Sequence, residues 1–138
     1  MIKFTSTLPD DQPQILRWAL ADPYHCAKAS IDGPGWWLTG QGVLSGCIED
    51  AGGPTMYFRF DLEGELVRLH TQFAPENEVT KTRVIRVISR AIPALAFKAK
   101  QEGAKGFVFE SVSPLLIRFM DRMGFKSVEN TNDYIFMF

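Results

Sequence analysis

Apolar runs closed by turn residues fill the middle of the chain and predict a β-rich region. Strands are expected at residues 43–49, 55–60 and 65–73, and residues 61–64 predict a hairpin turn between the last two. The run at 55–60 is rich in aromatic residues, which favour strands. Residues 2–4 predict a short first strand.

Apolar residues at helical spacing predict helices on both sides of this region. The first follows residues 8–13, where acidic side chains and proline suit a first helical turn. Asp22-Pro23 interrupts this helix, and residues 24–30 predict a second, short one. A longer amphipathic stripe begins after Asn77, and Pro93 within it predicts a kink or a break. The stripe consists of Val84, Val87, Ile88, Ala91 and Leu95.

The last third predicts a strand, a helix and a hairpin. Residues 107–110 form the expected strand, and residues 115–123 the expected helix. Ser113 is its N-cap, Pro114 occupies its first position, and Gly124 follows its end. Residues 126–128 and 134–138 then close the chain as a hairpin.

The resulting order, β-α-α-β-β-β-α-β-α-β-β, predicts an α+β fold with a mixed antiparallel and parallel sheet. The strand–helix–strand crossover around the long helix forces a parallel pair, which is expected to be right-handed. A crevice where two parallel strands part is a natural ligand position. No repeat, low-complexity tract or linker divides the chain, so a single domain spanning residues 1–138 is expected.

Composition excludes several classes of protein. The 15 Lys+Arg balance 16 Asp+Glu, which argues against a dedicated nucleic-acid surface. No apolar run is long enough to span a bilayer, and the first residues lack the apolar core of a secretory signal. Two cysteines do not build a disulfide framework, so a reduced, cytoplasmic setting is expected.

The segment at residues 113–125, SPLLIRFMDRMGF, resembles the last helix of the GNAT (GCN5-related N-acetyltransferase) fold, which also closes in Gly-Phe. The predicted element order extends this resemblance over nearly the whole chain. It implies an α/β/α-type GNAT domain that transfers an acetyl group from acetyl-CoA to a small-molecule or protein amine.

The family's Gly-rich turn, whose backbone amides hold the CoA diphosphate, corresponds to residues 78–83. Glu78 stands where the family has Arg or Gln, and Val79, Lys81 and Arg83 stand where it has glycines. The basic side chains of Lys81, Arg83 and Arg86 are expected either to compensate or to form a solvated helix face together with Arg90. The cofactor contacts that the resemblance implies are Thr71, Gln72, Phe73, Thr80, Lys81, Thr82, Arg83 and Ser113.

The resemblance also locates candidate catalytic groups. Met120 stands where many GNAT enzymes have a Tyr that protonates the leaving thiolate, and Met has no proton to donate. His70 and Glu110 are candidate bases for an amine. Alternatively, His70 is a strand histidine with a structural partner, and Glu110 caps the next helix. His25, Cys26, Cys47 and His70 lack paired ligand spacing, so no metal site is expected.

Two functions follow from these departures. One is an N-acetyltransferase with an atypical CoA site. The other is a GNAT-fold scaffold without catalysis, as in virion-associated proteins of short-tailed phages. The last helix of such proteins is similar to Ile117-Arg118-Phe119 and Gly124 of this chain, and the expected location of such a scaffold is the virion.

Two apolar segments have several possible roles. Trp36-Trp37 belongs either to the core, to an acceptor pocket or to an anchor for a protein contact. The residues 136–138 are either the last core strand or an edge buried against a homodimer or assembly partner.

Overall fold

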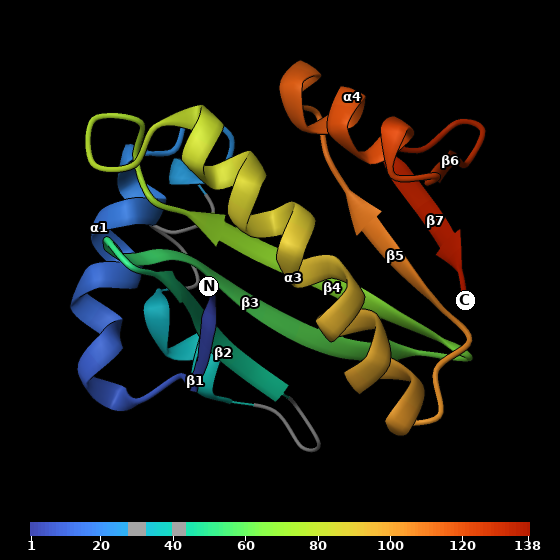
Figure 1. Cartoon of the computed structure of the whole chain (residues 1–138), viewed down its shortest axis with the longest axis horizontal. Helices are drawn as coiled ribbons and strands as arrows, with labels where there is room; N and C mark the ends of the chain where they lie inside the picture. Colours follow the sequence, from blue (N-terminus) through green and yellow to red (C-terminus); the bar gives the residue numbers. More distant parts are fainter. Residues whose placement is uncertain (28–32, 40–43) are drawn as a thin grey trace. The chain divides into compact units, whose positions relative to one another are not determined.

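The computed structural model of the chain describes residues 1–27, 33–39 and 44–138 (Figure 1). Within this part the strands are β1 (Lys3–Ser6), β2 (Leu44–Asp50), β3 (Gly53–Glu63), β4 (Leu66–Phe73), β5 (Gly106–Glu110), β6 (Lys126–Ser127) and β7 (Asp133–Met137). The helices are α1 (Gln12–Ala21), α3 (Lys81–Gln101) and α4 (Pro114–Arg122), with the 3₁₀ helices η1 (Pro9–Asp11) and η2 (Pro34–Leu38).

The described strands form one seven-stranded sheet in the order β1-β2-β3-β4-β5-β7-β6. β4 and β5 pair in parallel, whereas β5 and β6 each pair with β7 in antiparallel fashion. This mixed sheet confirms the predicted α+β fold class. The predicted second helix at 24–30 falls partly on residues 28–32, outside the described residues.

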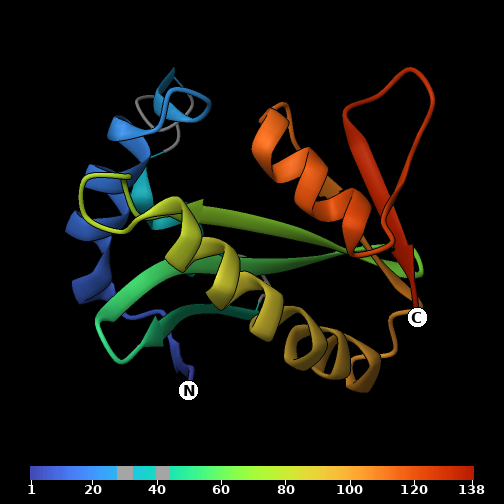
Figure 2. The same ribbon diagram turned by 45° about the horizontal axis from the view of Figure 1, so that its top comes forward.

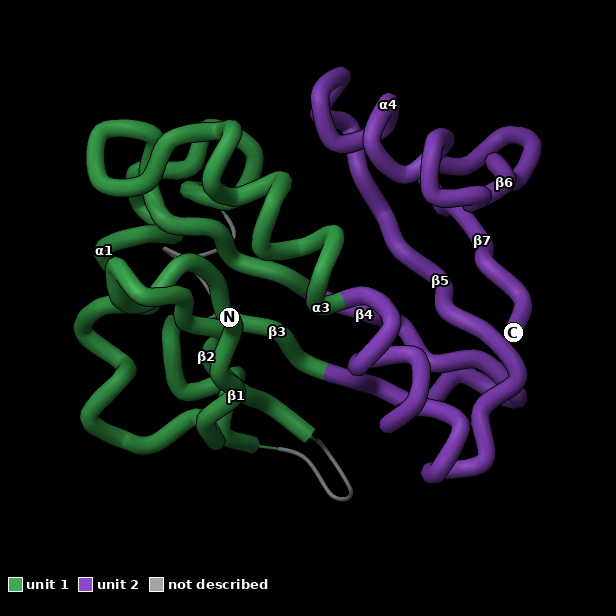
Figure 3. Tube along the Cα trace, viewed as in Figure 1, with its two compact units in different colours: residues 1–59, 71–91 green, residues 60–70, 92–138 purple. Residues whose placement is uncertain are grey.

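The chain divides into two compact units (Figure 3). The first unit contains residues 1–59 and 71–91, and the second contains residues 60–70 and 92–138. The boundaries fall within β3, β4 and α3, and the one in α3 lies just before Pro93. The single domain expected from the sequence stays a prediction.

Aromatic side chains build the core of the first unit. Trp18 of α1 lies 5.4 Å from the ring of Tyr57 on β3, and Trp37 of η2 lies 6.5 Å from the same ring. The Tyr57 hydroxyl donates to Asp11 Oδ1 at 2.8 Å and accepts from Gln14 Nε2 at 2.9 Å, so its polar end is satisfied where α1 begins. Of the alternatives for Trp36-Trp37, the structure assigns Trp37 to this core.

Phe107 on β5 belongs to the core of the second unit, where it is fully buried and its ring lies 5.0 Å from the ring of Phe138.

Helix α4 ends as the sequence predicts. Gly124, with φ of 96°, directs Phe125 back so that its N–H donates to Met120 O at 3.0 Å, which is the bond of a Schellman motif. Phe125 and Met120 are both buried beside this turn.

Two sequence predictions of local structure need correction. Of the kink or break predicted at Pro93, the break is absent, because helix α3 runs through Pro93 as Figures 1 and 2 show. Pro93 is exposed while Ala91 and Leu95 beside it are buried, so packing of the flanking residues outweighs the lost hydrogen bond.

The second correction concerns the hairpin turn predicted at 61–64. β3 instead continues to Glu63 and turns at Gly64, which has φ of 63°. Across the two strands His70 Nε2 lies 3.0 Å from Asp61 Oδ2, and Glu63 forms an ion pair with Arg68, so these polar residues have partners within the strands.

Gly106 provides a test of the β5 packing. A Cβ added to Gly106 would lie 2.6 Å from the carbonyl oxygen of Phe136 on β7, and backbone does not yield easily. Gly106→Ala is therefore expected to lower the free energy of unfolding by about 2–3 kcal/mol in urea denaturation. Gly103→Ala is the contrasting control: its φ of 88° strains an added side chain, whereas nothing lies within 4 Å of the added Cβ, and a loss of about 1 kcal/mol is expected. Equal losses in the two variants would contradict this account.

Candidate functional site

Residues 78–83, which the resemblance equates with the family's diphosphate turn, lead into the first turn of α3. Val79 is buried in the aromatic core of the first unit. Thr80 caps the helix: its Oγ1 accepts from the Arg83 N–H at 3.3 Å, and its carbonyl accepts from Val84 N–H at 3.0 Å. Thr80, Lys81 and Thr82 are exposed at this helix start. Val79 therefore serves as a core side chain beside this helix start.

Arg83 is committed to a carboxylate of the same unit. Its guanidinium donates to Asp50 Oδ2 at 2.7 Å and to Asp50 Oδ1 at 2.5 Å, a bidentate pair between α3 and the end of β2. Gly52 leaves room for it, since an added Cβ would lie 2.5 Å from Arg83 Nη2. The hydrogen bonds from Arg83 hold the pKa of Asp50 at about 2, against the opposing effect of burial.

The charges beside this turn are paired as well. Glu78 forms an ion pair with Arg17 of α1, and this contact holds the pKa of the Glu78 carboxyl below its usual range. Lys81 lies 3.5 Å from Glu76, and both side chains are mostly exposed. Of the two basic side chains in residues 78–83, Lys81 therefore has the longer and more exposed ion pair, and Arg83 the shorter one.

On β4, Gln72 joins Asp22 and His25, two residues that the sequence analysis does not place together. Gln72 is 2% exposed, and its Nε2 donates to Asp22 Oδ2 and to Phe73 O, both at 3.2 Å. Its Oε1 lies 3.0 Å from His25 Nδ1. Asp22 and His25 also contact each other at 3.2 Å. From the sequence Asp22 marks only the end of a helix, and the spacing Asp22-x-x-His25 is the local signal of this cluster. Thr71, beside Gln72, is buried.

The remaining sequence candidates lie in the second unit. His70 Nε2 lies 3.0 Å from Asp61 Oδ2. Glu110 is exposed at the end of β5, opposite Asp133. Ser113 stands at the N-cap position of α4, but its side chain makes no cap bond; its N–H donates to Ser111 Oγ at 3.2 Å.

The parallel ladder between β4 and β5 is short. It pairs Leu66 with Gly106, Val67 with Phe107 and Arg68 with Val108. His70 and Glu110 both follow the last of these pairs along their strands. Met120, which the resemblance equates with the position of the family's Tyr, is 3% exposed and is a core side chain of α4.

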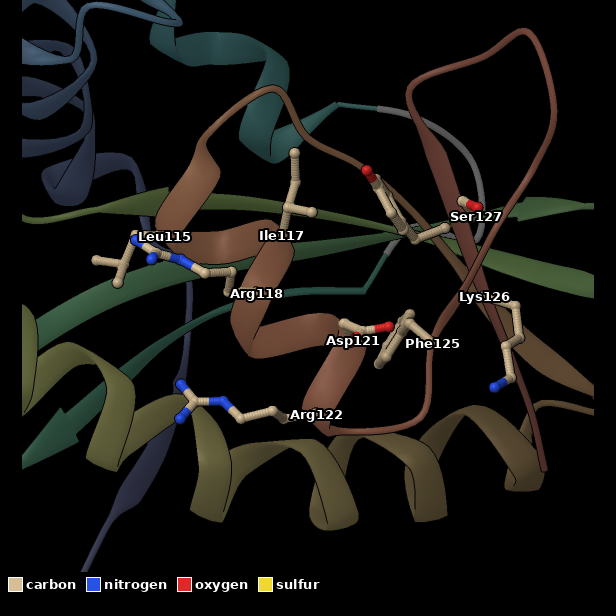
Figure 4. Close-up of a pocket in the computed structure, with 9 residues that line it drawn as sticks. Leu115, Ile117, Arg118, Asp121, Arg122, Phe125, Lys126 and Ser127 are labelled. Atoms are coloured by element: carbon tan, nitrogen blue, oxygen red, sulfur yellow. The ribbon is translucent and has the colours of Figure 1, made fainter.

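A surface pocket of about 810 Å³ lies against α4, β6 and β7 in the second unit (Figure 4). Arg118 and Arg122 extend from the same side of α4. The pocket contains none of the residues that the sequence singled out as site residues. Its lining is Leu115, Ile117, Arg118, Asp121, Arg122, Phe125, Lys126, Ser127 and Tyr134.

Two classes of site are not found in the described part of the chain. No group of three or more His, Cys, Asp or Glu residues there is arranged to hold a metal ion. None of the described helices is both long and apolar enough to cross a membrane.

No protein-family model matches the sequence, and no curated protein matches it. Several solved structures, in contrast, align with the chain. A putative acetyltransferase of the GNAT family from Desulfovibrio desulfuricans aligns with a TM-score of 0.68 and 12% identity, over 99% of this chain and 99% of its own. A probable acetyltransferase from Staphylococcus epidermidis aligns with a TM-score of 0.71 and 10% identity, over 99% of both chains.

An aminoglycoside acetyltransferase, AAC(6')-Ib, in complex with coenzyme A aligns with a TM-score of 0.67 and 10% identity, over 99% of this chain and 95% of its own. At such identities the likeness concerns the course of the backbone and not the side chains of a site. The chain has the fold of the GNAT acetyltransferases.

Proposed function

We propose that the chain binds an acyl-CoA and transfers the acyl group to an amine. The observation that carries the proposal is the GNAT fold, in which the β4–β5 ladder ends at the pair Arg68–Val108. In GNAT enzymes the strands part at this place and the strand edge pairs with the pantetheine arm. By this resemblance Thr71, Gln72 and Phe73 would offer backbone groups to the arm.

The first turn of α3 supports binding of the diphosphate in part. Thr80, Lys81 and Thr82 are exposed at the N-terminus of a 21-residue helix, where amide groups and the helix dipole favour an anion. Lys81 would add charge. Arg83 would contribute only after leaving Asp50. Ser113, at the start of α4, stays a predicted contact.

The acyl-CoA supplies an acyl group activated as a thioester. His70 would take the proton of the attacking amine, and Asp61 orients its ring as a carboxylate orients a catalytic histidine. Glu110 is the second candidate base because its carboxylate is exposed on the neighbouring strand. Met120 leaves the thiolate without a proton donor at the usual position of α4.

A second candidate function is a GNAT-fold scaffold or interaction protein without catalysis, of the kind found in phage virions. The pair between Arg83 and Asp50 favours it, because this pair occupies the cation that would otherwise meet a phosphate. Val79 in the core favours it too.

Calorimetric titration with acetyl-CoA separates the two functions. Lys81→Glu is expected to weaken binding about tenfold, because it reverses the charge at the helix start. Asp50→Asn is expected to tighten binding about fivefold, because it releases the Arg83 guanidinium. Asp10→Asn is the matched control: it removes the same charge from an exposed residue that does not pair with Arg83, and no change is expected. Absence of binding at millimolar acetyl-CoA in both wild type and Asp50→Asn would overturn the enzyme and leave the scaffold.

The same pair predicts a pH-dependent stability. Because the Asp50 pKa is about 2 in the folded chain and near 4 when unfolded, its contribution is complete above pH 4 and is lost as the pH falls toward 2. Asp50→Asn is expected to lower the free energy of unfolding by about 1 kcal/mol at pH 7. In urea denaturation this difference should disappear between pH 4 and pH 2. A difference that stays constant over that range would contradict the ion pair.

A further inference from the structure

The basic side chains of the second unit fall into two groups. The members of one group have partners within the unit: Arg68 with Asp133 and Glu63, Lys98 with Glu102, Lys105 with Glu65, and Lys100, whose Nζ lies 5.6 Å from the centre of the Phe138 ring. The other group is Arg118, Arg122 and Lys126, and no ion pair within the described residues includes any of them. All three line the pocket against α4, β6 and β7. The positive charge that the unit itself does not neutralise is therefore gathered at this pocket.

Two of these cations lie one helical turn apart. Arg118 and Arg122 are four residues apart on α4, and in Figure 4 their side chains extend from the same side of the helix, whereas Asp121 extends from the opposite side. Like charges at this spacing repel each other, which costs the helix stability when no anion is near. An anion between the two guanidinium groups reverses this effect, because both groups can donate N–H bonds to it.

The rest of the lining is mainly apolar, with two hydroxyl groups. Leu115 and Ile117 of α4 are half-buried, and Phe125, which follows the helix, is 2% exposed. Ser127 on β6 is the cross-strand partner of Tyr134 on β7, so their side chains share one face of the sheet. This lining fits a ligand that has an anionic group, an apolar body and a polar group at its far end.

Volume and charge narrow the class of ligand. The pocket volume of about 810 Å³ lies within the range of about 300–1,000 Å³ that is usual for small-molecule sites. The lining has three basic side chains against the single carboxylate of Asp121, an excess of two positive charges. A phosphate monoester carries about −1.5 to −2 charges at pH 7, whereas a carboxylate carries only one, so the phosphate monoester is the closer match.

We propose that this pocket binds a small phosphate monoester with an aromatic or aliphatic body. Arg118 and Arg122 bind the phosphate, Lys126 adds positive charge, and the body packs on the apolar part of the lining. The site is separate from that of an acyl-CoA, because the pocket contains none of the residues 71–73, 80–83 and 113 that the resemblance assigns to the cofactor. The proposal therefore goes beyond acyl transfer and applies equally to a scaffold.

Naphthyl phosphate is the probe, and calorimetric titration measures its affinity. It is expected to bind at least about tenfold more tightly than naphthol, naphthoate or inorganic phosphate, which lack the phosphate, its second charge or the apolar body. Arg118→Gln and Arg122→Gln are each expected to weaken binding at least about tenfold, because each removes charge-assisted hydrogen bonds. Lys98→Gln is the matched control: it removes one positive charge from the same unit outside the pocket, and no change is expected.

Thermal unfolding without the probe separates a loss of binding from a loss of the fold. Arg118 and Arg122 are exposed, so both variants are expected to keep the wild-type midpoint. In the wild type, the probe is expected to shift the backbone amide signals of Ser127 and Tyr134.

Several results would overturn the proposal. Equal affinity for naphthyl phosphate and inorganic phosphate would indicate an adventitious ion only, and unchanged affinity in both arginine variants would place the probe elsewhere. Displacement of the probe by acetyl-CoA would assign the arginines to the acyl-CoA, and tighter binding of a phosphotyrosine peptide would assign the phosphate to a protein partner. Failure of the probe to bind also overturns this site, but it leaves untouched the proposed function, which the acetyl-CoA titration tests by itself.

Discussion

The parallel pairing of β4 with β5 is the constraint on which the rest of the chain depends. Parallel strands cannot be joined by a tight turn, so the chain between Phe73 and Gly106 has to cross from one end of the sheet to the other. Helix α3 provides that crossing. A helix of this length needs a defined start, and Thr80 with the buried Val79 supplies it. Thr80 and Val79 thus anchor the start of the crossover helix.

Ion pairing commits three arginines to carboxylates of the chain itself. Arg83 is bound to Asp50, Arg17 to Glu78, and Arg68 to both Asp133 and Glu63. Each of these arginines has its charge matched by a carboxylate from another segment. Under the proposed function, a ligand phosphate at α3 would compete with Asp50 for the Arg83 guanidinium.

Periodicity and end signals predicted most of the fold. The stripe of α3, the cap and glycine of α4 and the order of the strands all depend on residues close in the sequence, where propensity acts directly. The break predicted at Pro93 is absent because burial of its neighbours, which the sequence does not show, outweighs the one backbone hydrogen bond that proline removes. For the candidate site, the sequence predicts which positions belong to it but not which side chains contact one another. Contacts such as Gln72 with Asp22 and His25, or Arg83 with Asp50, join residues far apart and depend on strand register.

The placement of the aromatic core has a spectroscopic consequence. All 3 tryptophans, Trp18, Trp36 and Trp37, belong to the first compact unit. Intrinsic tryptophan fluorescence therefore follows that unit alone, whereas far-ultraviolet circular dichroism follows the helices and strands of both. The two signals, recorded on the same denaturation, distinguish an unfolding event confined to one unit from one that takes the whole chain.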